Sequence, residues 1–345
     1  ILAQAILLKL PRALCQHGLF RCSSPLLRWS GRFGALLMQA GGIRALDGIA
    51  RFVDTHCHLD LILPRLAREQ RQRSAPSRAA RPGSTDAVPG DRPLPKTFPE
   101  WRDSLRGPER GFEGCVTIGC SLRSLEKAEG LLRHEGVHGA FGIHPLYASD
   151  WKSSVEQKLR GMMTLPKAVA WGECGLDYYD KSTGGEVQNM DWRALQRSVF
   201  ARQMQLAVAL GKPLVVHSRC AEADTLALMS EHLPSSHLIH AHCFTSSKAM
   251  ASELLRRFPK LYLGFTGVIT FKTAGEVRDV VALTPLRRIL LETDGPYMAP
   301  LPHRGSVAHP GHIVLVAEEV AKIKQISFGE VLSVCRENAR QIYGF

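Results

Sequence analysis

Short apolar runs alternate with segments of helical pattern along the chain from Phe52 onward. The runs are rich in Val, Ile and Leu, and the segments between them repeat apolar residues at helical spacing. The runs are FVDTHCH (52–58), CVTIGC (115–120), GAFGIHP (139–145), AVAWGECGLDY (168–178), PLVVHSR (213–219), HLIHAHCF (237–244), LYLGFTG (261–267) and ILLETDGP (289–296). Eight strands, each followed by a helix or loop, predict an α/β fold of the (β/α)8 TIM-barrel type. A doubly wound open sheet is the alternative, although no G-x-G-x-x-G motif follows the first run.

Two segments lack this pattern. Residues 1–50 hold six Lys and Arg against one acid, which predicts a basic, poorly ordered extension, either a mitochondrial transit peptide or a piece of a longer basic extension. A stretch of about 69–96 mixes Arg, Pro, Gly and Ser, which predicts a flexible insertion. The segment after it, TFPEWRDSLRG (97–107), predicts a short helix against the core. The barrel domain is therefore expected over 51–345.

Composition narrows the class of protein. The 345 residues are 45% hydrophobic and 22% charged, so the chain can bury a full core. The net charge of +12 favours a polyanionic partner, because basic side chains release counterions from phosphates, although a solvated basic surface would give the same total. No apolar stretch approaches the roughly 20 residues that span a bilayer, so no membrane partner is expected.

The cysteines indicate a reducing compartment. There are nine, with no C-x-x-C pair, and Cys57, Cys115, Cys174 and Cys243 lie in apolar runs. We interpret them as reduced core thiols, with a zinc site as the alternative. An intracellular protein is expected, in the nucleus or cytoplasm, with the mitochondrion as the other candidate.

The first run places polar side chains at alternate positions. In FVDTHCHLDL, Asp54, His56, His58 and Asp60 would all project from one face of a strand. Two hydrogen-bonded histidines at a strand end would explain the pair equally well. The pair therefore needs further ligands before it indicates a metal site.

Those further ligands occur at the ends of other runs. Active sites of such barrels lie at the carboxyl ends of the strands. The polar residues expected there are His144, Glu173, His217, His242 and Asp294. Imidazoles together with carboxylates are ligands for Zn, Mn or Mg. Each residue alone could be a hydrogen-bonded structural group, but together they predict a metal centre.

The runs also resemble a known family. FVDTHCHLD, GIHP, GECGLDY, VVHSR, HCF, GFTG and ETDGPY, in this order, resemble the TatD family of metal-dependent deoxyribonucleases, within the amidohydrolase-like metallo-dependent hydrolases. The resemblance extends from about Phe52 to Phe345, apart from the insertion. One departure is Ala308, where many members have Asn after an R-G pair, and it leaves open the shape of the loop after the last strand.

The resemblance implies two divalent metal ions, Mg, Mn or Zn. His56, His58 and Asp294 would hold one ion, His217 and His242 the other, and Glu173 would approach both. One carboxylate can serve two cations that lie about 3.5–4 Å apart. Asp294 would also accept a proton from the attacking water, or act as a ligand alone.

Further residues are expected around the ions. His144 and Arg219 would contact phosphate, although a structural ion pair explains Arg219 equally well. Aromatic rings would stack on exposed bases, with loop packing as the alternative. The rings are Tyr178, Tyr179, Phe244 and Tyr297. Asp60 and Asp177 would orient metal-bound imidazoles, and His240 is expected to be a hydrogen-bonded core residue.

The expected function is divalent-metal-dependent hydrolysis of nucleic-acid phosphodiester bonds. The substrate would be DNA, with RNA as a further candidate, attacked from the 3′ end by a monomer. The alternatives are a metal-dependent hydrolase of a small amide or phosphoester and a non-catalytic nucleic-acid-binding barrel. Many hydrolases with the same H-x-H entry bridge their ions with a modified lysine on the fourth strand. Glu173 at that place favours the nuclease.

Overall fold

The computed structural model describes residues 50–73 and 97–345. The predicted extension over 1–50, apart from its last residue, lies outside the described residues. Helix α1 (Leu59–Arg73) continues beyond the predicted start of the insertion near residue 69, so residues 69–73 are helical. The rest of the predicted insertion, 74–96, lies outside the described residues.

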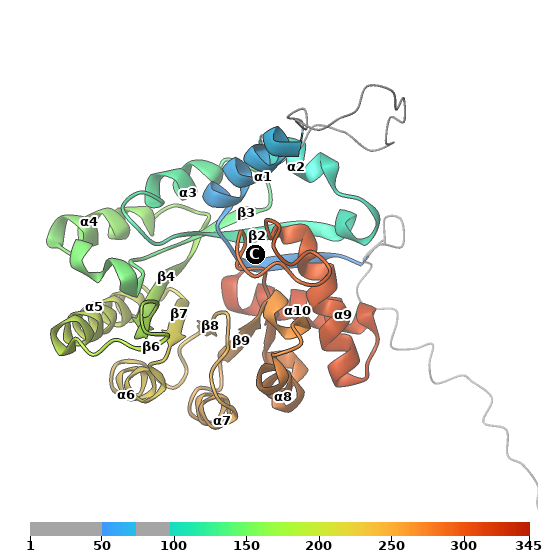
Figure 1. Ribbon diagram of the computed structural model, residues 1–345. Helices are drawn as coiled ribbons and strands as arrows, with labels where there is room; N and C mark the ends of the chain where they lie inside the picture. Colours follow the sequence, from blue (N-terminus) through green and yellow to red (C-terminus); the bar gives the residue numbers. More distant parts are fainter. Residues whose placement is uncertain (1–49, 74–96) are drawn as a thin grey trace, which may run out of the picture. The chain divides into compact units, whose positions relative to one another are not determined.

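Eight parallel strands form a nearly closed barrel, as predicted (Figure 1). Neighbours in the sheet follow the chain order, with the first and last strands at the two edges. The strands are β1 (Phe52–Cys57), β2 (Phe112–Gly119), β3 (Val137–Phe141), β4 (Ala168–Asp177), β7 (Leu214–Arg219), β8 (Ile239–Ala241), β9 (Leu261–Phe265) and β10 (Ile289–Leu291). A short antiparallel pair, β5 (Tyr179–Asp180) and β6 (Gly185–Glu186), follows β4.

Backbone contacts join the two edges of the barrel beyond the end of β10. A parallel bridge connects Cys57 with Gly295. The amide of Asp294 donates to the carbonyl of His56 at 2.9 Å, and the amide of His58 donates to the carbonyl of Gly295 at 2.8 Å. These bonds bring the H-x-H segment beside Asp294, although the two lie far apart in the sequence.

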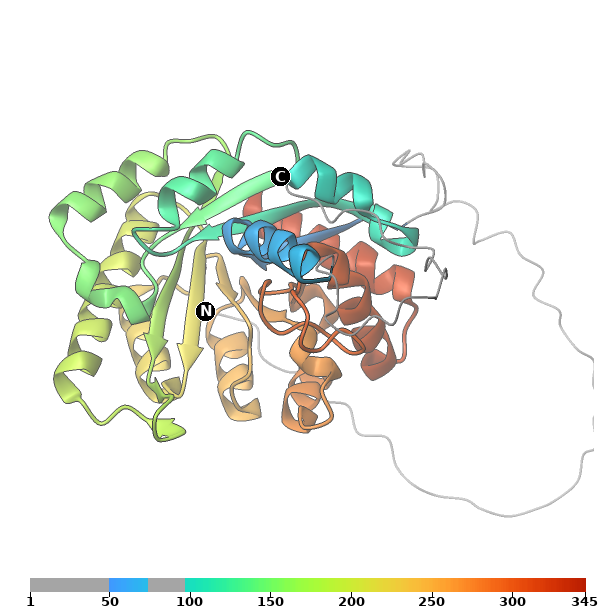
Figure 2. The ribbon, with the colours of Figure 1, turned by 45° about the horizontal axis from the view of Figure 1, so that its top comes forward.

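Helices cover the outside of the barrel (Figures 1 and 2). After α1 they are α2 (Phe98–Ser104), α3 (Leu125–Leu131), α4 (Ser153–Met162), α5 (Met190–Ala209), α6 (Glu222–His232), α7 (Lys248–Arg257), α8 (Gly275–Leu283), α9 (Ile313–Lys324) and α10 (Phe328–Tyr343). Short 3-10 helices are η1 (Gly107–Gly111), η2 (Pro145–Asp150), η3 (Gly267–Thr270), η4 (Leu286–Arg288) and η5 (Pro310–His312). Side-chain caps define several helix starts, including Ser247 before α7 and Ser327 before α10. The short helix predicted after the insertion is α2, and its Phe98 and Trp101 are buried.

Helix α10 packs against the amino end of the barrel. Asn338 donates to the carbonyls of Leu286 and Ile289, and the guanidinium of Arg336 pairs with Glu113 at the start of β2. The last turn places the Tyr343 hydroxyl 2.6 Å from His240 Nδ1. The polar residues expected in the site lie at the opposite end of the barrel, where the strands have their carboxyl ends.

All seven cysteines within the described residues are free thiols. Cys57, Cys115 and Cys174 are fully buried, as expected for core thiols, whereas Cys243 is half-buried. Among the described helices, none has the length and apolar character needed to cross a membrane.

Candidate metal centre

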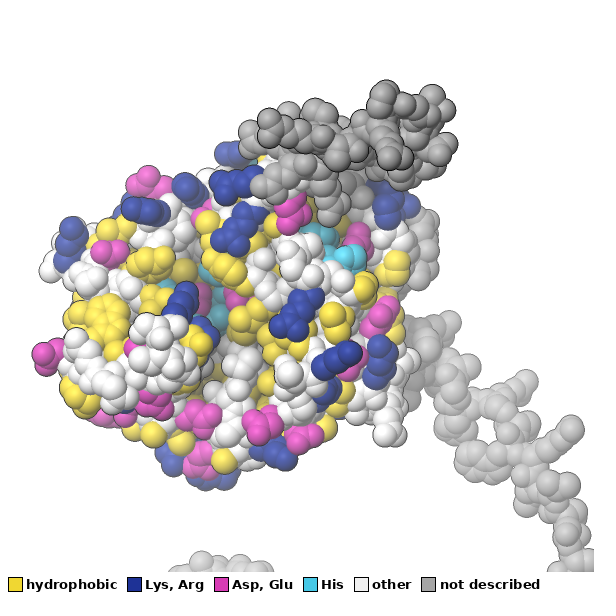
Figure 3. Space-filling view, in the orientation of Figure 1, with side chains coloured by type: hydrophobic (Ala, Val, Ile, Leu, Met, Phe, Trp, Pro, Cys, Tyr) yellow, Lys and Arg dark blue, Asp and Glu magenta, His cyan; other side chains and the backbone are white. Residues whose placement is uncertain are grey.

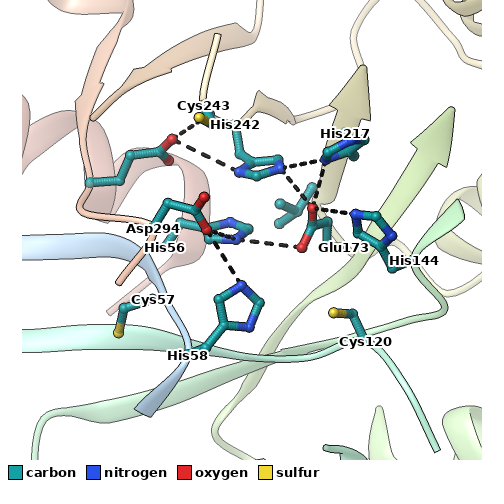
Figure 4. A network of polar contacts seen from close by, with 12 residues as sticks. His56, Cys57, His58, Cys120, His144, Glu173, His217, His242, Cys243 and Asp294 are labelled. Carbon is teal, nitrogen blue, oxygen red and sulfur yellow. Dashed lines mark hydrogen bonds and ion pairs between the residues drawn. The ribbon is translucent and has the colours of Figure 1, made fainter. Parts of the chain in front are cut away.

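Strand β1 and the position directly after it provide the two histidines of the H-x-H segment. His56 is fully buried, and its Nε2 lies 3.6 Å from both Glu173 Oε2 and Asp294 Oδ1 (Figure 4). His58 follows the strand, and its Nε2 lies 3.4 Å from Asp294 Oδ1. Because α1 begins at Leu59, Asp60 lies in the first helical turn, and the prediction that it continues the strand face is wrong.

Asp54, two residues before His56, has a structural role. Its Oδ1 accepts from the amides of His56 and Thr293, and its Oδ2 accepts from the Thr293 hydroxyl at 2.6 Å. These bonds tie β1 to the segment after β10. Asp294 directly follows Thr293 and has a left-handed backbone, φ +50°, which Asp tolerates better than most residues.

Glu173, on β4, lies at the centre of the cluster. Its Oε1 is 2.7 Å from His242 Nε2, 2.9 Å from His217 Nδ1 and 3.4 Å from His144 Nε2. Burial by itself raises the pKa of Glu173, but the surrounding histidines, His242 and His144 first, hold it well below its usual value. A buried carboxylate that stays ionised among imidazoles is suited to contact cations.

His217 and His242 face each other across this carboxylate. His217 Nδ1 lies 3.1 Å from His242 Nε2, while His217 Nε2 lies 3.2 Å from Asp177 Oδ2. Burial opposes protonation of His217, but the hydrogen bonds with Asp177 and Glu173 outweigh it and raise the pKa to about 9. Asp177 is therefore placed as predicted for a group that orients an imidazole.

The donor set fits divalent cations. In four sets of three residues, ligand atoms lie within 4.8 Å of one another. The sets are His56, His58 and Glu173; His56, His242 and Asp294; His144, Asp177 and His217; and Glu173, His217 and His242. Both ring nitrogens of His56 are buried without a hydrogen-bond partner, and burial lowers its pKa to about 3, so the ring is neutral with a free lone pair. Such an orphaned nitrogen is expected of a metal ligand.

Glu292, which the sequence pattern did not single out, is fully buried behind the cluster. It accepts from the amide of Cys243, its Oε2 lies 2.7 Å from His240 Nε2, and its Oε1 lies 4.0 Å from His242 Nδ1. His240, which also contacts Tyr343, is a hydrogen-bonded core histidine as predicted. A signal for Glu292 was available, because it stands two residues before Asp294 in ETDGP.

The residues expected to bind substrate divide into two groups. His144 lies at the cluster, and the guanidinium of Arg219 lies 3.8 Å from the centroid of the Tyr179 ring. Tyr178 is only 2% exposed and its hydroxyl donates to Asp224, while Phe244 is 6% exposed and lines an apolar pocket with Met250 and Leu254. The structure therefore contradicts the prediction that Tyr178 and Phe244 stack on bases, because neither ring is accessible.

Two other aromatic rings are accessible at the same end of the barrel. Tyr297 is 44% exposed and Tyr179 is half-buried. Ala308, the departure noted in the sequence, is fully buried, and its amide donates to the carbonyl of Pro296. Figure 3 shows histidine side chains at the bottom of a hollow in this face, next to acidic side chains and dark-blue basic ones.

Fold and donor set together define a metal-dependent hydrolase of the TIM-barrel class. The family model described as TatD related DNase matches residues 53–344, and the chain belongs to this family. It is 36% identical over 298 residues to the human protein named 3'-5' RNA nuclease TATDN2, an alignment that covers 85% of this chain and 35% of that protein. The chain thus spans about a third of that relative's length.

Bacterial relatives are similar over most of their own length. The chain is 33% identical to the uncharacterized metal-dependent hydrolase YcfH of Escherichia coli K12, covering 68% of this chain and 84% of that protein. It is 32% identical to the uncharacterized metal-dependent hydrolase YabD of Bacillus subtilis, covering 67% and 87%. The solved structure of YJJV, a TatD homologue from Escherichia coli K12, superposes with a TM-score of 0.65 at 21% identity, covering 86% of this chain and 99% of that one. This last likeness shows the shared fold.

Proposed function

We propose that the cluster holds two divalent metal ions and hydrolyses phosphodiester bonds of nucleic acids. His56, His58 and Asp294 would hold one ion, His217 and His242 the other, and Glu173 would serve both. The observation that carries this proposal is the position of Glu173, whose two oxygens face His56 on one side and the His217–His242 pair on the other. When bound, such ions supply a hydroxide near neutral pH and neutralise charge on the phosphate.

The protein's own groups have separate tasks in this proposal. Asp294, 8% exposed at the edge of the cluster, accepts the proton of the attacking water on a carboxylate oxygen. Burial raises the pKa of Asp294, but the hydrogen bond with His58 and the nearby imidazoles outweigh it, so the carboxylate is ionised and ready to accept. Asp177 keeps the His217 ring oriented. His144, which follows β3, and Arg219, the last residue of β7, bind the phosphate.

Two lines of support favour a nucleic acid as substrate. The human relative is named a 3'-5' RNA nuclease, and the family is described by a deoxyribonuclease name. The net charge of +12 suits a polyanion. We therefore propose a 3′–5′ exonuclease acting on DNA, with RNA as the second substrate, in which residues 51–345 form the catalytic domain and act as a monomer.

The test is cleavage of single-stranded DNA and RNA, labelled at either end, with Mg²⁺ or Mn²⁺. Wild-type protein is compared with Glu173→Gln, which keeps the shape but removes the charge, and with Glu337→Gln, an exposed glutamate on α10. We expect Glu173→Gln to lose at least 100-fold in rate, because a neutral amide would hold cations less well than the carboxylate that would serve both ions, and Glu337→Gln to match wild type. The order of products distinguishes attack from the 3′ end from internal cleavage.

Inert wild-type protein that still binds Mn²⁺ would overturn the nuclease proposal. Hydrolysis of small amides and phosphoesters would then be measured, since barrels of this class also act on such substrates. Equal rates for wild type and Glu173→Gln would overturn the assigned site instead.

A further inference from the structure

A cavity lies between α1 and the loop after β10, and its lining residue Pro296 stands two positions after Asp294. Its volume is about 260 Å³. It is lined by Arg65, Arg68, Glu69, Pro296, Gly305, Ser306 and Val307. This volume is below the roughly 300–1,000 Å³ of pockets that enclose a drug-sized ligand. The cavity therefore suits a smaller group, such as one sugar-phosphate unit.

Tyr297 connects this cavity to the metal centre. Its ring meets the His58 ring edge-to-face, with centroids 6.3 Å apart. The Arg65 guanidinium carbon lies 4.9 Å from the Tyr297 centroid, and Arg65 Nη2 lies 3.5 Å from the Tyr297 hydroxyl. With 44% of its surface exposed, Tyr297 retains area on which a base can stack.

The charge of the cavity suits a phosphate. Arg65 and Arg68 are exposed and three residues apart on α1, so they lie on the same face of the helix. No carboxylate within residues 50–73 and 97–345 forms an ion pair with either one. The acidic group in the lining, Glu69, accepts a hydrogen bond from the amide of Val307 at 3.0 Å, which fastens the loop to α1.

We propose that this cavity is a subsite for a neighbouring nucleotide of a single-stranded nucleic acid, whose base stacks on Tyr297 while its phosphate pairs with Arg65 and Arg68. The inference rests on the nuclease function proposed above and adds to it the direction in which the strand leaves the metal centre. A guanidinium binds a phosphate in a planar, two-point contact, and exposed aromatic rings accept any base. The subsite would therefore favour longer strands without selecting their sequence.

The test compares a nucleic acid with a substrate too small to reach the cavity. Hydrolysis of a single-stranded oligonucleotide and of bis(p-nitrophenyl) phosphate is measured for wild type, Arg65→Ala/Arg68→Ala and Tyr297→Ala. Arg287→Ala is the matched control, because Arg287 is an exposed arginine in η4, before the amino end of β10. Mn²⁺ binding and thermal unfolding verify that each variant is folded.

For the double arginine variant we expect kcat/KM on the oligonucleotide to fall about tenfold or more, mainly through KM, with unchanged hydrolysis of the small ester. The slope of log kcat/KM against log salt should become shallower by about 0.7 for the lost phosphate contact. Tyr297→Ala should lose about 5- to 150-fold on the oligonucleotide, and Arg287→Ala should match wild type on both substrates.

The outcomes separate this inference from the one on which it rests. If wild type cleaves the oligonucleotide and the double arginine variant does so equally well, the subsite is refuted and the nuclease function stands. If the variants lose activity equally on both substrates, the residues act on the metal centre and the subsite is also refuted. If wild type hydrolyses only the small ester, the nuclease function and the subsite fall together.

Discussion

Replacing Asp177 by Asn should weaken one of the two proposed metal sites and spare the other. Asp177 is 3% exposed at the end of β4, where its Oδ2 contacts His217 Nε2 and its Oδ1 accepts from the amide of Tyr179. Its backbone is held on both sides by the Gln196 side chain, so the substitution should change the side chain alone. Burial raises the pKa of Asp177, but the hydrogen bond with His217 outweighs it, so the native group is a carboxylate.

The size of the effect follows from this one contact. A hydrogen bond to a charged group contributes about 1.5–3 kcal/mol, which corresponds to roughly 10- to 150-fold in affinity. This agrees with the loss of about 10- to 100-fold that is typical when a group orienting a metal-bound histidine is removed. We expect that loss at the site of His217 and His242, and no more than a small change at the site of His56 and His58.

The assay is calorimetric titration of metal-free protein with Mn²⁺. Asp224→Asn is the control, because Asp224, on the neighbouring α6, bonds with Tyr178 and with Arg197 of α5 and does not contact the histidines. Unchanged affinity at both sites in Asp177→Asn, or an equal loss at both, would refute the argument that Asp177 acts through His217.

Two further predictions concern stability. The hydrogen bonds from Arg336, together with Arg340, lower the pKa of Glu113, so the stabilisation is present above the usual pKa near 4.5 and is lost as pH falls through the folded value. The free energy of unfolding measured with urea at pH 7 should therefore be lower by about 1–2 kcal/mol in Glu113→Gln than in wild type, and the difference should be smaller at pH 3. A difference that does not depend on pH would contradict this prediction. Mn²⁺ at 100 times the dissociation constant of a site should stabilise the protein by about 2.7 kcal/mol for each site it fills, raising Tm relative to EDTA in wild type but little in Glu173→Gln; an equal rise in both would exclude Glu173 as a ligand.

Much of the site was predictable because it depends on local patterns and one topological rule. Alternation along β1 aims His56 into the barrel, and parallel strands bring their carboxyl ends to one face. Glu173 and His217 lie within their strands β4 and β7, so their positions follow from the same rule. His242 and Asp294 lie just beyond the short strands β8 and β10, and they were found through the longer apolar runs that contain them.

Accessibility was not predictable in the same way. The Tyr178 ring is buried where its hydroxyl donates a hydrogen bond to Asp224 of α6. The Phe244 ring is buried where it lines a pocket together with Met250 and Leu254 of α7. A ring next to a strand end can point into the mouth or into the helix layer, and neighbouring helices decide between the two. The spacing of aromatic residues along the chain contains no information about that choice.

The sequence by itself determined the alternation of strands and helices, which follows from short-range periodicity, and it offered the polar side chains at the strand ends as candidate metal ligands because of their chemistry. Only the tertiary structure decided that Asp60 leaves the strand face, that Glu292 lies behind His242, and that Arg65 meets Tyr297 across 232 positions of sequence. These facts depend on contacts between distant segments. Burial and pairing in a folded protein are properties of such contacts, and a linear pattern does not specify them.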